Sequence, residues 1–127
     1  MSGPKSSRYT LTPEQRRILA EQRRIEAAKA VADYFEGRIV YITVMNALSV
    51  DCDCDAHQGE PVMDDLGIIA SLDPVANDQA FIDMVWASDD PGALKLRERI
   101  DRQEGRHILP YAEEIGLGSR EYELVEI

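Results

Sequence analysis

Residues 38–50, "RIVYITVMNALSV", constrain the fold more than any other part of the chain. The run is rich in β-branched residues, and such near-continuous apolar runs are typical of strands that are buried on both faces. Residues 65–71, "DLGIIAS", show the same pattern over a shorter length and predict a second short buried strand. We therefore expect a small sheet covered by helices.

A long helix is predicted ahead of the first strand, over residues 13–35. Thr12 is suited to cap it, Pro13 suits its first position, and Gln15 completes a capping box. Gly37 is expected to end the helix. Two heptads carry a repeated Glu-Gln-Arg-Arg-Ile motif. This repeat is too short for a coiled coil, so we expect the helix to pack against the rest of the protein or to bind a partner. The residues expected to face the body are Ile25, Ala28, Val31, Ala32 and Phe35.

The second half of the chain predicts three more helices. "DPVANDQAFIDMVWAS" has Asp73 as a cap and Pro74 at the first helical position. "ALKLRERIDRQ" predicts a charged, exposed helix, and "ILPYAEEIGLG" a short helix stopped by Gly116 or Gly118. The alternating "YELVEI" predicts a final strand. The expected fold class is α/β, with a small mixed sheet and covering helices, preceded by a long N-terminal helix.

Charge divides the chain unevenly. Residues 1–38 carry eight Lys or Arg and five Asp or Glu, whereas residues 39–127 carry six and nineteen. We therefore expect a disordered N-terminus over residues 1–11, a basic amphipathic helix over residues 12–36, and an acidic α/β domain over residues 37–127. The acidic body argues against nucleic-acid binding, because phosphate contacts need clustered Lys and Arg.

The chain has no apolar segment long enough for a transmembrane helix, and "MSGPKSSRYT" lacks the apolar core of a secretory signal. No membrane partner is expected, and the expected compartment is the cytoplasm. Thiols stay reduced in that compartment, so a cysteine pair there favours metal binding or redox activity over a structural disulfide.

The motif "DCDCDAHQ", residues 51–58, contains the two cysteines of the chain. If this segment is extended, both thiols point to one face and the aspartates to the other. Two thiolates on one face can bind one soft metal ion if the chain bends, and the histidine is a candidate third ligand. The predicted metal-site residues are Cys52, Cys54, His57, Asp53 and Asp55.

The predicted site is incomplete in one chain. The two expected cofactors are zinc and an iron–sulfur cluster. Each is normally bound by four ligands, and this segment supplies three at best. His107, Asp64 or Asp65 could contribute a ligand. Otherwise a protein partner or a homodimer is expected to supply the rest.

The motif also has three alternative interpretations besides a metal site. A calcium loop is excluded, because Ala56 stands where that loop needs glycine and Val62 where it needs glutamate. A redox-active cysteine pair and an inert acidic turn both stay open. The surrounding carboxylates disfavour a free thiolate, so a highly reactive nucleophile is not expected without a metal.

Other polar residues have simpler explanations than catalysis. Asp73 precedes proline at a helix start and is expected to cap that helix, while Asp78 lies past the first turn and is a better functional candidate. The "GLGSRE" segment could hold an anion, although Gly116 more simply ends a helix. No Ser–His–Asp set and no phosphate-binding loop is visible, so the sequence assigns no reaction.

From "DCDCDAHQGEPVMDD" through "LGIIASLDPVANDQAFIDMV", and in "YAEEIGLGSREY", the chain resembles the C-terminal half of a prokaryotic family, domain of unknown function 362. The resemblance spans residues 31–127. It implies an iron–sulfur or ferredoxin-like protein, as family members are often described. The chain departs from the family by lacking its N-terminal half and its cysteine-rich insert, which implies a fusion, a truncated member, or one subunit of a larger assembly.

The sequence therefore supports three functional hypotheses. The first is a metal- or iron–sulfur-binding domain that acts as a redox or electron-transfer accessory protein. The second is a non-enzymatic protein-interaction module, or a truncated family member with no metal site. The third is an oxidoreductase completed by a partner chain.

Overall fold

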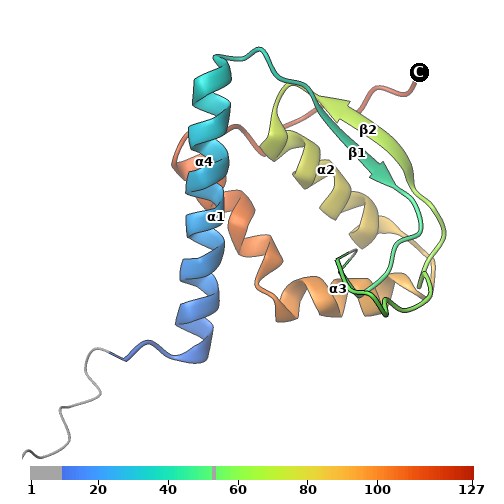
Figure 1. Ribbon diagram of the computed structural model, residues 1–127. Helices are drawn as coiled ribbons and strands as arrows, with labels where there is room; N and C mark the ends of the chain where they lie inside the picture. The colour runs from blue at the N-terminus through green and yellow to red at the C-terminus, as the bar shows by residue number, and fades with distance from the viewer. Residues whose placement is uncertain (1–9, 53) are drawn as a thin grey trace, which may run out of the picture.

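The computed structural model describes residues 10–52 and 54–127 and has the expected α/β fold with a long helix first (Figure 1). The expected disordered N-terminus falls almost wholly on residues 1–9, which lie outside the described residues; Thr10 and Leu11 are exposed coil. The elements, in order, are α1 (Pro13–Phe35), β1 (Tyr41–Met45), β2 (Gly67–Ser71), α2 (Pro74–Ala87), α3 (Ala93–Arg102), the 3-10 helix η2 (Gly105–His107) and α4 (Ile108–Glu114).

Helix α1 begins and ends as its sequence predicts. Thr12 accepts a hydrogen bond from the Gln15 backbone, and the Gln15 side chain accepts one from the Thr12 backbone, which completes the capping box. At the other end the backbone turns left-handed at Glu36 (φ 48°) and Gly37 (φ 78°).

The way α1 meets the body differs from the prediction. Ile25 packs against the cluster that α2 and α4 share, as expected. Val31 and Phe35 are instead 53 % and 41 % exposed, and Ala28 is exposed as well. Figure 1 shows the C-terminal turns of α1 projecting beyond α4, the helix that α1 contacts most.

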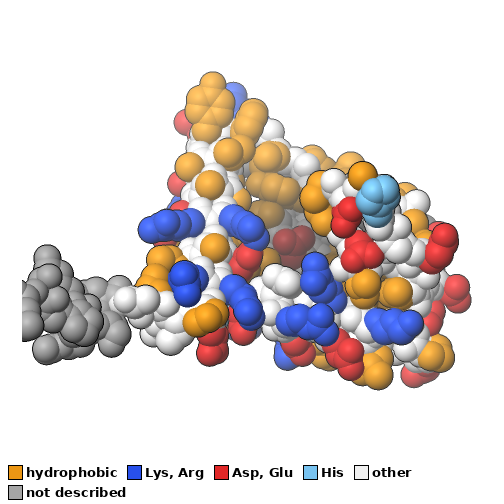
Figure 2. Space-filling view, turned by 60° about the horizontal axis from the view of Figure 1, so that its bottom comes forward, with side chains coloured by type: hydrophobic (Ala, Val, Ile, Leu, Met, Phe, Trp, Pro, Cys, Tyr) orange, Lys and Arg blue, Asp and Glu red, His pale blue; other side chains and the backbone are white. Residues whose placement is uncertain are grey.

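Helix α1 is also not basic by itself. Residues 12–36 contain five Lys or Arg and five Asp or Glu, so the excess positive charge comes from the flanking residues. Ion pairs along the helix, Arg24 with Glu21 and Lys29 with Asp33, balance part of this charge locally. Figure 2 shows Lys and Arg side chains gathered on α1 and on the adjacent part of the body.

No helix in the described part of the chain is long and apolar enough to cross a membrane.

Strands β1 and β2 form a two-stranded antiparallel sheet in which Thr43 lies opposite Ile69. Helix α2 covers one face of this sheet, and Met45 on that face is only 1 % exposed. The opposite face is open: Ile42, Val44 and Ile68 are more than half exposed. The prediction of strands buried on both faces is therefore wrong for this chain, because no second layer covers the sheet among the described residues.

Two apolar clusters hold the helices together. The first joins Met63 of the β1–β2 connection to Val85 of α2 and Leu96 of α3. The second joins Val75 of α2 to Leu109 of α4, and α1 reaches it through Ile25. Both clusters depend on α2, because it contributes Val85 to the first and Val75 to the second. Full burial of a side chain the size of Val85 contributes about 1.5–3 kcal/mol.

The predicted final strand does not form. Residues 121–127 are coil and exposed, and they make no ladder with β1 or β2. Instead the Tyr122 hydroxyl donates a 2.8 Å hydrogen bond to Asp83 Oδ2 on α2. Tyr122 therefore links this segment to α2 through its side chain, and Leu124 and Val125 stay more than half exposed.

Candidate thiol site

The two cysteines lie in the connection between β1 and β2, residues 46–66. This connection leaves the sheet at the end of β1 and folds back beside α3 (Figure 1). Cys52 and Cys54 are both exposed. The position is open to solvent and to other molecules.

A turn, and not an extended strand, brings the two sulfur atoms together. The backbone N–H of Asp55 donates to the carbonyl of Cys52 over 2.9 Å, which closes a four-residue turn. The Cα atoms of Cys52 and Cys54 are 5.2 Å apart, and the sulfurs are joined as a disulfide. The Cys54 N–H also donates to Cys52 Sγ over 3.3 Å. The sequence predicted one shared face for the thiols from strand alternation, and the turn achieves this by a different geometry.

Two aspartates beside the cysteines stabilise the turn itself. Asp51 Oδ2 accepts a 2.8 Å hydrogen bond from the Gly59 backbone. Asp55 Oδ1 accepts a 2.9 Å hydrogen bond from the His57 backbone. Both aspartates adjoin a cysteine in the sequence, so acidic side chains flank the turn on both sides.

The other predicted ligands are not gathered around the cysteines. Asp53 lies outside the described residues. Within residues 10–52 and 54–127, no group of three or more His, Cys, Asp and Glu side chains is placed to hold a metal ion. His57 and Asp55 therefore stay predictions as ligands, and His107 belongs to η2, which contacts α1, α3 and α4.

The connection that carries the thiols is fixed to the body by Asp90. Its Oδ2 accepts from the Asp64 backbone over 2.8 Å, and its Oδ1 accepts from the Gly92 backbone over 2.7 Å. These two backbone hydrogen bonds lower the pKa of Asp90. Asp90, in "SDDPG", was not among the residues that the sequence singled out; an aspartate two residues before a glycine signals the local bond to Gly92, but not the bond to Asp64.

A second contact fixes the same connection. A Cβ atom on Gly92 would lie 1.4 Å from the carbonyl oxygen of Val62, so only glycine allows this approach. Asp65 Oδ1 also accepts a 2.8 Å hydrogen bond from the Ala47 backbone at the base of the connection. Asp64 and Asp65, which could have been ligands, thus help to hold this connection in place.

The "GLGSRE" segment is occupied by carboxylates of the chain itself. Asp73 caps α2 as predicted and also accepts from the Ser119 backbone. Glu113 accepts from the Arg120 backbone and guanidinium, and these contacts lower the pKa of Glu113. Gly116 (φ 78°) follows α4 as its terminating glycine. The backbone donors that could have held an external anion are therefore used internally.

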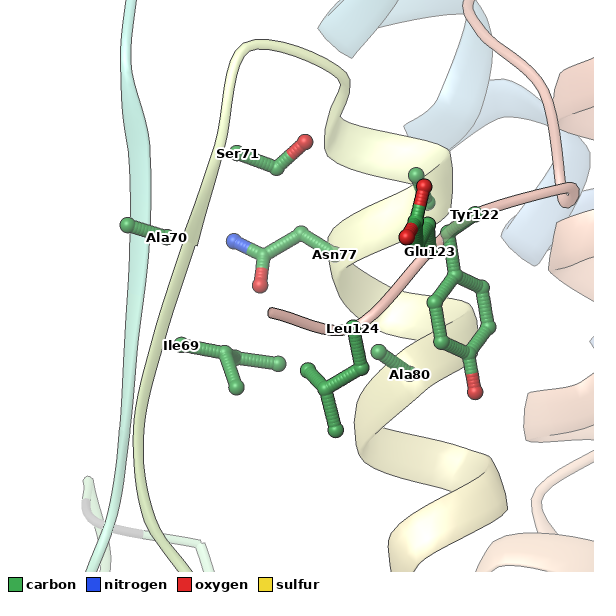
Figure 3. A pocket seen from close by; sticks show the side chains of 9 residues that line it. Ile69, Ala70, Ser71, Asn77, Ala80, Tyr122, Glu123 and Leu124 are labelled. Atoms are coloured by element: carbon green, nitrogen blue, oxygen red, sulfur yellow. The ribbon is translucent and has the colours of Figure 1, made fainter. Parts of the chain in front are cut away.

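A small cavity of about 70 Å³ lies between β2, α2 and the C-terminal segment. Figure 3 shows the Asn77 amide pointing from α2 toward β2, between Ser71 and Ile69. Asn77 is 4 % exposed, and its side-chain oxygen has no hydrogen-bond partner among the described residues. Next along α2, desolvation raises the pKa of Asp78, although the residue as a whole is exposed.

The fold and this site define a small α/β protein that presents a two-cysteine turn at one end of its sheet. The family described as "Domain of unknown function (DUF362)" matches residues 4–83, more than half of the chain, and the chain therefore belongs to this family. The match includes the long helix, both strands and the thiol turn. It begins and ends earlier than the range of 31–127 that the sequence suggested. Comparison with curated proteins and with solved structures gives no match.

Proposed function

We propose that the chain is a metal-binding protein whose reduced Cys52–Cys54 pair binds a soft metal ion, with Zn²⁺ as the principal candidate. The observation that supports this most directly is the convergence of the two sulfur atoms in an exposed turn. Two thiolates whose sulfur atoms lie close together can both bind the same metal ion.

The donor set fits a single ion better than a cluster. A [4Fe–4S] or [2Fe–2S] cluster is held by four cysteines, and this chain has two. Zinc accepts mixed ligands, including imidazole and carboxylate groups. His57 and Asp55 are the nearest candidates in sequence for the remaining positions, and a second protein molecule is the alternative. An iron–sulfur cluster requires two such chains, or a partner that brings two thiols.

The acidic surroundings favour a cation at this turn. Asp51 and Asp55 flank the cysteines, and residues 39–127 carry nineteen Asp or Glu against six Lys or Arg. Negative potential raises the local concentration of cations, and a bound cation offsets the cost of forming thiolates beside carboxylates. The same electrostatics disfavour the pair as a metal-free nucleophile.

The disulfide makes metal binding depend on redox state. An external dithiol or phosphine must first deliver two electrons, with two protons taken up, to convert the disulfide into two thiols. Zinc binding then releases those two protons as thiolate–metal bonds form. The oxidised chain has no thiolate to offer. An external disulfide that accepts two electrons from the Cys52–Cys54 pair, and is itself reduced to two thiols, is therefore expected to release the ion.

A cobalt titration tests this proposal. The protein is reduced with a phosphine under anaerobic conditions and titrated with Co²⁺, whose sulfur-to-metal absorption reports thiolate ligation. We expect the band in the wild type, half its intensity or less in Cys52→Ser or Cys54→Ser, and none in the oxidised wild type. His57→Ala and Asp55→Asn then show whether either completes the site. A reduced wild type that gives no charge-transfer band contradicts the proposal.

A second candidate function is a protein-interaction module. It is favoured by a different observation, the open apolar face of the β1–β2 sheet. This candidate does not depend on the cysteines.

A further inference from the structure

One face of the sheet presents two adjacent rows of apolar side chains to solvent, one from each strand. In the register of the sheet, Ile42 lies opposite Ala70 and Val44 lies opposite Ile68. The two rows continue one step past the strand ends. We call this surface the apolar sheet face; its residues are Val40, Ile42, Val44, Ile68, Ala70 and Leu72.

The apolar sheet face carries no charged side chain, although charged residues make up 30 % of the chain. Its exposed fractions are 64 % for Ile42, 55 % for Val44 and 68 % for Ile68. An antiparallel sheet with one solvated face normally alternates apolar and polar residues. Here apolar side chains occupy both faces, which is the pattern of a sheet covered on both sides.

The area of this face suits a protein interface. Five of its side chains are 55–75 % exposed, Val40 at 60 % and Leu72 at 75 % among them. Their combined exposed surface is comparable with the roughly 300–600 Å² of the largest apolar patch on ordinary monomers. Each partner in a standard interface contributes about 800 Å². The face is therefore large enough to form the centre of an interface, with polar residues at its rim.

We infer that the apolar sheet face is the contact surface between two copies of this chain. A two-fold contact requires a surface that complements itself, and an uncharged face of paired aliphatic rows does so. A strongly charged partner finds no opposite charge on this face to pair with. Sheets that pack face to face lie about 10 Å apart with their strands within about 30° of each other. The resulting dimer is a sandwich of two sheets, with α2 of each copy as an outer layer.

This dimer does not rest on the metal proposal, but it determines how the two thiol turns are placed. A two-fold axis along the strands brings both turns to the same end of the sandwich. An axis across the strands places them at opposite ends. Only the first arrangement allows four thiolates to meet.

Sedimentation equilibrium of the reduced protein, with a chelator present, tests the inference without any metal. The variants Val44→Lys and Ile68→Lys place a charge at the centre of the face, at positions exposed enough to leave the fold intact. Lysine is chosen because it makes the net charge of −10 less negative, so the loss of the dimer cannot be attributed to stronger repulsion between the two chains. The matched control is Leu94→Lys on α3, where the leucine is 57 % exposed.

The wild type and Leu94→Lys are expected at twice the 14.3 kDa mass of the chain. Val44→Lys and Ile68→Lys are expected to raise the dimer dissociation constant about tenfold or more, with unchanged circular dichroism. A wild type that stays at the monomer mass up to about 0.5 mM overturns the inference. A dimer that responds equally to all three variants overturns it as well, since the contact then lies elsewhere.

Discussion

The backbone N–H of Ser119 donates a 2.8 Å hydrogen bond to Asp73 Oδ2, although the two residues are 46 positions apart. The other oxygen, Oδ1, accepts from the backbones of Val75 and Ala76 at the start of α2. Asp73 therefore caps a helix and holds the segment after α4 at the same time. Gly118 permits this contact, because a Cβ atom there would lie 2.0 Å from Asp73 Oδ1.

Replacing Asp73 with alanine is expected to lower the free energy of unfolding by about 1–3 kcal/mol, because the helix cap and the link to Ser119 are both lost. Asp73→Asn is expected to lose less, since its amide oxygen can still accept at the cap. Urea unfolding measures both, with the exposed Asp89→Ala as the control. Equal stability of Asp73→Ala and the control would show that the segment after α4 is held by other contacts.

Replacing Gly92 with alanine is expected to destabilise the connection that carries the thiols. The backbone at Gly92 (φ −71°, ψ −23°) is one that alanine adopts freely, so any loss must come from the clash with Val62. We expect a loss of about 2 kcal/mol or more, as for other steric clashes in packed regions. Hydrogen exchange should show faster exchange across residues 46–66. An alanine variant as stable as the wild type contradicts the close contact between this connection and α3.

Arg97 is expected to stabilise the end of α2. Its guanidinium donates to the Val85 carbonyl over 2.9 Å and to the Ser88 carbonyl over 2.7 Å. Arg97→Ala should cost about 1.5–3 kcal/mol, the range for hydrogen bonds from charged groups. Arg97→Lys should recover only part of this, because an ammonium lacks the planar pair of donors. Thermal unfolding of the two variants checks the order; lysine as damaging as alanine would argue against the hydrogen bonds.

Acid is expected to destabilise the fold partly through Asp90 and Glu113. Backbone hydrogen bonds lower the pKa of each carboxyl group in the folded state. A lowered pKa contributes stability above the unfolded value of about 4, and this contribution is lost as the pH falls through the folded-state pKa. Asp90→Asn and Glu113→Gln should therefore show a shallower loss of stability below about pH 4, measured by urea unfolding. A slope identical to that of the wild type would contradict the assignment.

Local signals in the sequence were sufficient for the helices. The capping box at Thr12 and the Asp73–Pro74 start place α1 and α2 with their observed first residues. The failures arise where a distant segment decides the outcome. The "YELVEI" alternation predicts a strand, but residues 121–127 are coil and pair with neither strand. The open sheet face depends on a layer that the described residues do not supply.

The sequence predicted the cysteines of the candidate site but not the contacts that position them. Composition identified Cys52 and Cys54, and the structure joins their sulfurs through a turn that the sequence did not predict. The contacts that position this turn come from Asp90 and Gly92, which follow the cysteines by more than 35 residues. A pairing between two irregular segments has no periodicity, so sequence pattern could not reveal it.

Zinc stoichiometry of the reduced protein tests the proposed function most directly. The anaerobic wild type and a Cys52→Ser/Cys54→Ser double variant are titrated with Zn²⁺ in competition with a chromophoric chelator. The account predicts one zinc per chain, or one per two chains if four thiolates meet, and loss of this binding in the double variant and in the oxidised wild type. A reduced wild type that takes no more zinc from the chelator than the double variant does would contradict it.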